Sequence, residues 1–211
     1  MHKENQLLKA LKEENISLNQ RLVGLHEESH RVWALIRKLN QLQVNRRELN
    51  RSSDLLMMIR KILEVALEAV GSENGSVLLY DQADQELVFV AVIGVRSQEL
   101  LDYRIPIDQG IAGWVARNRS AALVSDVRND QRWLSAVDQS VGFHTRSVLA
   151  VPLIIEDRLL GVVEVVNSRK EDAFSDQDLQ LLMLVARLAS FVFGFAEEVL
   201  RENRVGRVEA S

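Results

Sequence analysis

The stretch of sequence that decides the fold is a series of short ordered segments: GIAGWV at 110–115, DVRND at 126–130, GFHTRS at 142–147, VPL at 151–153, LGVVEVVN at 160–167 and FSDQD at 174–178. Residues 147–155 and 159–167 are rich in Val, Leu and Ile, and the polar residues 156–158 separate them. This pattern predicts a hairpin of two central strands. Ser175 and Asp178 have the spacing of a capping box, so a helix is expected to begin directly after the hairpin.

The sequence around this stretch predicts further short elements. Apolar spacing predicts a helix at 54–70 capped by Ser53, and the polar and glycine residues 71–75 are expected to end it. The remaining expected elements are strands at 76–80, 86–92, 103–107 and 121–124, a helix at 110–119 and a short helix or loop at 130–137. Strands joined by hairpins, with helices at both ends, predict an α+β fold in which helices flank an antiparallel sheet.

In this order and spacing, the segments resemble a GAF domain, a small sensory module of signalling proteins, over roughly residues 55–195. The resemblance implies a GAF-type antiparallel sheet with the first and last helices on one face. It implies that the helix at 110–119 and residues 121–143 cover the other face and enclose a ligand pocket. It implies a sensing role without naming a ligand, so the cofactor stays open.

The first 49 residues predict a long coiled-coil helix ahead of the domain. Apolar residues recur there at alternating steps of three and four, with Leu11, Leu18, Leu25, Val32 and Leu39 at d and Leu8, Asn15, Leu22, Ser29 and Ile36 at a. An Asn at an a position favours a parallel two-stranded register, so we expect a parallel homodimer. The alternative is an amphipathic helix packed on its own domain. The expected organisation is a coiled coil at 1–49, a GAF domain at 50–203 and a flexible tail at 204–211.

Composition and charge narrow the function classes. The chain has 211 residues, a formal net charge of −4 with acidic and basic residues interleaved, and no cysteine. The lack of a basic face argues against nucleic acid. The lack of cysteine excludes disulfides, thiolate zinc sites and cysteine nucleophiles, and with them the chemistry of the GAF-type methionine sulfoxide reductases. We therefore expect no enzyme activity.

Two segments bear on the cellular location. The amino terminus has no apolar signal region. Residues 179–196 are apolar enough to raise the question of a membrane span, but Arg187 lies near the middle of this run, where a charge is costly in a lone span. We expect a cytoplasmic protein with no membrane span.

The sequence His26-Glu27-Glu28-Ser29-His30 matches the zinc-protease pattern of two histidines four residues apart. On a helix this spacing places both imidazoles on one face. Here the pair occupies rim positions of the heptads, and the sequence offers no third ligand or cleft. We predict no catalytic residue and no physiological metal site, with adventitious zinc or nickel binding as the alternative. His144, in the domain, suits ordinary hydrogen bonding better than a haem or metal.

A partial match concerns cyclic nucleotides. Asn167, Phe174 and Asp178 match part of the signature of cyclic-nucleotide-binding GAF domains, but Ser168 and Leu179 replace its lysine and glutamate. The ion pair that the resemblance implies for that lysine and aspartate cannot form between these positions. Phe174 and Asp178 are accounted for by the helix start, as a hydrophobic staple and a capping box.

Seven residues are predicted to line a ligand pocket: Ile111, Trp114, Asp126, Trp133, Phe143, Thr145 and Glu164. Mostly apolar walls with a few polar groups are typical of small-molecule sites. Glu164 shares a strand face with Val162 and Val166, so its carboxylate faces a pocket, a structural partner or solvent. Asp126 has the alternative of capping a turn, and Thr145 that of a surface position.

These features predict a signal-transduction sensor that binds a small molecule and signals through a helical dimer interface to a downstream protein. The alternative is a ligand-free GAF module that acts as a dimerisation and interaction scaffold. A retained ligand distinguishes the two.

Overall fold

The computed structural model describes residues 52–169 and 173–208, together with Lys12, Glu14, Ile16, Ser17 and Gly24. Contacts divide the chain into two units, residues 1–41 and 42–211, and the second unit contains the sheet. The predicted dimerisation residues of the coiled coil lie outside the described residues, as do His26 and His30: Leu11, Asn15, Leu18, Leu22, Leu25, Val32 and Leu39.

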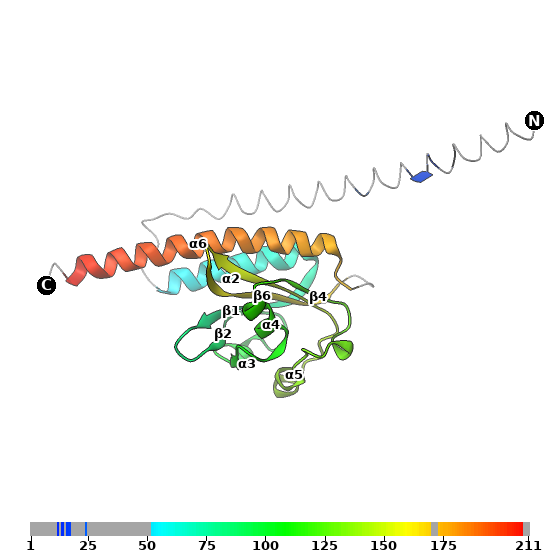
Figure 1. Cartoon of the computed structure of the whole chain (residues 1–211), viewed down its shortest axis with the longest axis horizontal. Helices are drawn as coiled ribbons and strands as arrows, with labels where there is room; N and C mark the ends of the chain where they lie inside the picture. Colours follow the sequence, from blue (N-terminus) through cyan, green and yellow to red (C-terminus); the bar gives the residue numbers. More distant parts are fainter. Residues whose placement is uncertain are drawn as a thin grey trace, which may run out of the picture. The chain divides into compact units, whose positions relative to one another are not determined.

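Six strands form one antiparallel sheet in the order β3-β2-β1-β6-β5-β4 (Figure 1). The strands are β1 Ser72–Asp81, β2 Glu86–Ile93, β3 Arg104–Pro106, β4 Ala122–Val124, β5 Val148–Ile155 and β6 Arg158–Ser168. The helices are α2 Ser52–Val70, α3 Ser97–Leu100, α4 Gly110–Asn118, α5 Ser135–Val141 and α6 Asp176–Val208, with a 3₁₀ turn, η1, at Val127–Asn129. The predicted α+β class with an antiparallel sheet is confirmed.

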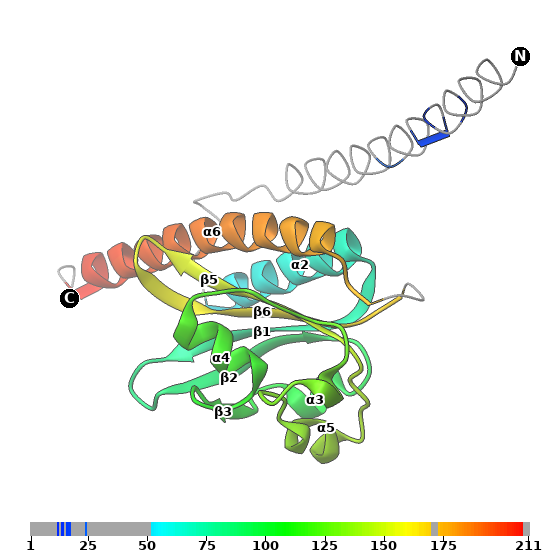
Figure 2. The same cartoon turned by 45° about the vertical axis from the view of Figure 1, so that its right-hand side comes forward.

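The sheet separates two layers of helices. Helices α2 and α6 pack on each other and against β1 and β5 on one face, whereas α3, α4 and α5 lie on the other (Figures 1 and 2). The face covered by α2 and α6 buries Ile59, Leu63 and Val185. The opposite face has its own apolar core, in which Leu78 and Val162 of the central strands pack with residues of α4 such as Val115. This second layer contains the candidate site.

The start of α6 confirms the predicted capping box. The Ser175 hydroxyl donates to Asp178 Oδ2 at 2.7 Å, and the Asp178 amide donates back to Ser175 Oγ at 3.3 Å. The Ser175 amide also donates to Asp178 Oδ2, at 2.9 Å. Phe174, directly before the cap, is buried. These contacts satisfy amide groups that a helix amino terminus otherwise leaves without partners.

Four elements differ from the sequence-based expectation. Residues 72–75, expected only to end the preceding helix, begin β1, where Ser72 pairs with Ser168 of β6 and its hydroxyl donates to the Val166 carbonyl at 2.7 Å. Helix α3 was not predicted, and α5 occupies only the end of the expected segment 130–137 and continues past it, from Ser135 to Val141. Helix α6 continues to Val208, so residues 204–208 of the expected flexible tail are helical. Its sequence has no proline from 176 to 208, so nothing in it forces an earlier end.

One segment of α6, Asp176–Gly194, is long and apolar enough to cross a membrane by length and composition alone. Of this segment, 44% is buried inside the protein, where α6 contacts α2 and β5. A core helix of a domain passes the same test, so the segment is weak evidence for a membrane span.

Candidate ligand-binding cavity

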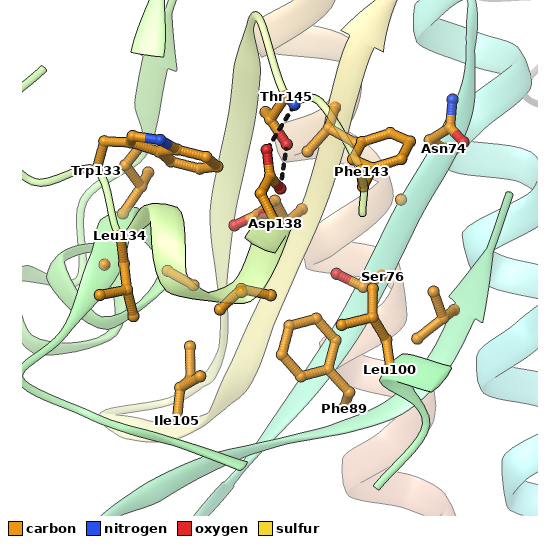
Figure 3. A pocket seen from close by; sticks show the side chains of 18 of the residues that line it. Asn74, Ser76, Phe89, Leu100, Ile105, Trp133, Leu134, Asp138, Phe143 and Thr145 are labelled. Atoms are coloured by element: carbon orange, nitrogen blue, oxygen red, sulfur yellow. Dashed lines mark hydrogen bonds between the residues drawn. The ribbon is translucent and has the colours of Figure 1, made fainter. Parts of the chain in front are cut away.

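A cavity opens between the sheet and the layer formed by α3, α4 and α5 (Figure 3). Its walls come from β1, β2, β3, β6, the start of α4, residues 133–138 and the loop before β5. The cavity has a volume of about 80 Å³.

Most of the cavity wall is apolar. Phe89 and Ile105 approach from β2 and β3, Leu100 comes from α3, and Trp133 and Phe143 flank α5 (Figure 3). Large apolar and aromatic walls are the usual lining of a small-molecule site, because they favour an organic ligand over water. The polar groups are few, so their positions decide what the cavity can recognise.

The floor of the cavity presents two polar side chains on neighbouring strands. Ser76 of β1 lies opposite Glu164 of β6 in the antiparallel register, and both line the cavity. Ser76 is 5% exposed and Glu164 is half-buried. Within the part of the chain that the structure describes, neither side chain makes a hydrogen bond to another protein group. Both groups therefore keep their hydrogen-bonding capacity for the contents of the cavity.

The electrostatics of the floor are dominated by carboxylates. Burial, and then the nearby Asp138 carboxylate, raise the pKa of Glu164 to about 7 from its ordinary 4.5. Burial disfavours the charged form, and a like charge adds to that effect. No lysine, arginine or histidine is among the described residues that line the cavity. An ionised Glu164 is therefore not neutralised by a cation of the cavity wall.

Asp138 is held in place by the loop that leads into β5. Its Oδ2 accepts from the Thr145 amide at 2.7 Å, and its Oδ1 accepts from the Thr145 hydroxyl at 2.8 Å (Figure 3). The Phe143 amide donates to the backbone carbonyl of Asp138 at 3.0 Å. Gly142 ends α5 with a φ of 62°, which glycine adopts without strain. These bonds fix the Asp138 carboxylate at the cavity.

Asn167 anchors the same loop from the end of β6. Its Nδ2 donates to the His144 carbonyl at 2.8 Å, and its Oδ1 accepts from the Arg146 amide at 2.7 Å. Asn167 has a φ of 58°, a left-handed conformation that Asn tolerates better than most residues. His144 contributes its backbone to this contact, and its side chain is exposed. Among the described residues, no group of three His, Cys, Asp or Glu side chains could hold a metal ion.

The glycines of the GIAGWV segment let α4 approach the β3 connection closely. A Cβ atom at Gly113 would lie 2.5 Å from the Ile107 carbonyl oxygen, closer than real Cβ atoms come to such an atom. Gly110 has a φ of 72° and itself borders the cavity. This close packing holds the first turn of α4, with Ile111 and Ala112, at the cavity wall.

Five of the seven predicted pocket residues line the cavity: Ile111, Trp133, Phe143, Thr145 and Glu164. Trp114 and Asp126 are absent from its lining. The Trp114 ring lies 4.4 Å below the guanidinium carbon of Arg132, which forms an ion pair with Asp130. Asp126 caps η1 by accepting from the Arg128 amide, and its hydrogen bonds to the Arg128 side chain keep its pKa below the ordinary value. Asp126 therefore has the role that the sequence offered as its alternative, the cap of a turn.

Sequence reasoning missed several cavity residues, including Asn74, Ser76, Phe89 and Asp138. Ser76 was recognisable only through its cross-strand pairing with Glu164. Asp138 lay one residue past the expected short helix at 130–137 and gave no local signal. Asn74 was expected only to help end the first helix; it lies in β1, and its Oδ1 accepts from the Val95 amide at 3.1 Å.

Comparison with known proteins decides the family. The statistical model of the family described as GAF domain matches residues 52–193. The chain belongs to the GAF domain family. GAF domains are sensory and signalling modules. In this GAF domain, the matched residues include the sheet, helices α2 to α5, α6 as far as residue 193 and every side chain of the cavity.

The relatives of this GAF domain have varied functions. It is 38% identical over 87 residues, 41% of the chain, to the alpha' subunit of the mouse cone cGMP-specific 3',5'-cyclic phosphodiesterase, and it spans 10% of that protein's length. The GAF domain of a Coxiella burnetii phosphoenolpyruvate-protein phosphotransferase superposes with a TM-score of 0.64 at 18% identity, covering 78% of this chain and 95% of the other. Free methionine-R-sulfoxide reductase of Neisseria meningitidis superposes with a TM-score of 0.65 at 21% identity, and the match covers 84% of this chain and 93% of the other. At these identities the structural likeness shows the fold alone.

Proposed function

We propose that this chain is a cytoplasmic sensory GAF protein that binds a small molecule in the cavity and signals through its helices to a downstream protein. The observation that supports the proposal is the floor of the cavity. Ser76 and Glu164 point their unused hydrogen-bonding groups at a space whose other walls are mostly apolar. A few polar groups in an otherwise apolar cavity wall are what orients a small-molecule ligand, because they can form hydrogen bonds with it.

In this proposal the signal is a shift of helices. Strands β1 and β6 form the floor of the cavity on one face and support α2 on the other. A ligand that binds one arrangement of these strands better than another shifts the population toward it. The proposed chain performs no chemistry of its own, binds no nucleic acid, does not span a membrane and acts as a parallel homodimer.

Native mass spectrometry of the purified full-length chain tests ligand binding, because a retained ligand adds mass that disappears on denaturation. A thermal-shift screen of nucleotides, cyclic nucleotides, amino acids and tetrapyrroles extends the test to ligands lost in purification. Cyclic nucleotides belong in it because one relative is a cGMP-specific phosphodiesterase. A ligand at a hundredfold excess over Kd stabilises the fold by about 2.7 kcal/mol. No added mass and no shifted midpoint would count against the proposal.

A specific observation favours the ligand-free dimerisation module as a second candidate. Helix α6 exposes Leu184, Leu188 and Phe191, which is 70% exposed, at spacings that place them on one helix face. Helix α2 exposes Leu56 and Met57. Exposed large apolar residues grouped in this way are typical of an interface.

Light scattering tests this second candidate. In the full-length chain, Phe191→Glu is expected to shift the dimer toward the monomer, whereas Gln82→Glu, which adds the same charge at an exposed position in the turn between β1 and β2, leaves it unchanged. A dimer that persists in Phe191→Glu and dissociates on deletion of residues 1–41 assigns dimerisation to the amino-terminal segment. A monomeric full-length chain at micromolar concentration removes both dimer proposals.

A further inference from the structure

The charged side chains that line the cavity are all acidic. Two carboxyl groups, Glu164 and Asp138, border it, and the described residues of its wall include no basic side chain. The neighbours of Glu164 on the adjacent strands add no charge, because β1 presents Ser76 and β5 presents Ala150 opposite it. Helix α4 contributes Ile111 and Ala112 to the same cavity. The charges that face Glu164 from the surrounding elements therefore reduce to that of Asp138 on α5.

The two carboxyl groups differ in what satisfies them. Asp138 accepts two hydrogen bonds from Thr145 and stays fixed. Glu164 accepts none within the described part of the chain, and the Ser76 hydroxyl, in a residue 95% buried, stands across the strand pair from it without a partner of its own. Ser76, a residue only 5% exposed that lines the same cavity as Glu164, is an observation independent of the acidic pair. Together the two carboxyl groups and the hydroxyl offer hydrogen-bond acceptors to a ligand, and the ligand would have to supply the donors.

Resting on the proposed function, we propose that the ligand of this cavity is a compact organic cation. Its ammonium or amidinium group lies between Glu164, Asp138 and Ser76. Its apolar body lies against Phe89, Ile111 and Phe143. A cationic nitrogen supplies the donors that Glu164 lacks, and it offsets the repulsion between the two carboxylates. The volume of the cavity, about 80 Å³, suits a compact ligand. Anionic ligands meet two carboxylates and no wall cation.

Protonation of Glu164 supports the same assignment. Its raised pKa, about 7, reflects a carboxylate that burial and Asp138 leave uncompensated. A bound cation favours the ionised form, so binding releases a proton near neutral pH. If the cation binds only the ionised form, its affinity rises about tenfold between pH 6 and pH 8, because the ionised fraction rises by that factor.

Three probes of one shape test the charge preference: benzylamine, benzyl alcohol and benzoate, each titrated at millimolar concentration into the full-length chain by isothermal calorimetry and followed by amide NMR. We expect benzylamine to bind at least tenfold more tightly than benzyl alcohol at pH 8, and benzoate to bind least. Glu164→Gln is expected to remove that tenfold advantage and the pH dependence together, while benzyl alcohol changes less than twofold. The matched control Glu64→Gln, at an exposed site on α2, leaves all three affinities unchanged.

The outcomes separate this inference from the proposed function. Equal binding of benzyl alcohol and benzylamine, or tighter binding of benzoate, overturns the cation and leaves a ligand-binding cavity in place. Binding of benzylamine that persists unchanged in Glu164→Gln overturns the site. A native mass spectrum that shows a retained anionic ligand overturns the cation while it supports the sensor. If no probe binds and no ligand is retained, both proposals fall.

Discussion

Glu164 makes the stability of the domain depend on pH, and the variant Glu164→Gln exposes this dependence. With a pKa of about 7 in the fold and an ordinary value of 4.5 in the unfolded chain, complete ionisation of Glu164 costs the folded state about 3 kcal/mol. The folded state binds the proton more tightly than the unfolded state, so raising the pH favours unfolding. The cost is absent well below pH 4.5, grows as the pH rises from there to 7, and is complete above 7.

The measurement is the free energy of unfolding in urea, followed by helical circular dichroism at a series of pH values. The protein is first unfolded and refolded so that it carries no small molecule. Relative to Glu164→Gln, the wild-type chain is expected to lose about 2.5 kcal/mol of stability between pH 5 and pH 8. Subtracting the variant's curve removes the contributions of the other titrating groups, which both proteins share.

Two further variants sharpen the result. Glu64→Gln removes a carboxylate from an exposed ion pair with Arg60 and is expected to follow the wild-type pH dependence. Asp138→Asn removes the like charge near Glu164 and so lowers its pKa in the fold; the loss of stability is expected to be smaller and to be complete at a lower pH. A difference between wild type and Glu164→Gln that stays constant from pH 5 to pH 8 would refute the reasoning, since it would mean that Glu164 is as well solvated in the fold as in the unfolded chain.

Three other substitutions test the structural reasoning. Asp178→Ala removes the capping box of α6 and is expected to cost about 1 kcal/mol in urea unfolding, whereas Asp176→Ala, outside the Ser175 pair, is expected to cost less; equal losses would contradict the cap. Asn167→Gly keeps the left-handed backbone but loses the bonds to the 144–146 loop, so it is expected to destabilise the domain by about 1–3 kcal/mol and to accelerate amide exchange at Thr145; unchanged exchange would argue against the anchor. Trp133→Ala is expected to lower the thermal shift produced by any ligand found, with the ligand-free midpoint kept near wild type, and an unchanged ligand shift would remove Trp133 from the site.

Much of this fold follows from local sequence signals. The capping box at Ser175 and Asp178 involves residues three apart, so the sequence alone contains the whole interaction. The alternation of residues 162–166 likewise places Glu164 on the face of Val162 and Val166, and the structure has Val162 in the core and Val166 in the wall of the cavity layer. These predictions succeed because strand geometry gives every second residue the same face.

The parts that sequence could not supply depend on contacts between distant residues. The start of β1 rests on Ser72, whose hydroxyl bonds to Val166 ninety-four residues away. Asp138 reaches the cavity because the chain turns at Gly142 and brings Thr145 back to it. Trp114 was expected in the pocket on its residue type, but Arg132 covers its ring instead. Each error involves a partner that no periodicity or spacing reveals.

The geometry of the two central strands bears on how a ligand would be sensed under the proposed function. Ser76 and Glu164 face the cavity, whereas the next residues, Val77 and Val165, are buried on strands that also support α2. Because successive side chains of a strand point to opposite faces, a displacement of the β1–β6 floor moves both surfaces at once. Only the sheet then separates a ligand at Glu164 from the layer formed by α2 and α6. It needs no relay through loops, and substitutions at Val77 or Val165 would disturb signalling without touching the ligand.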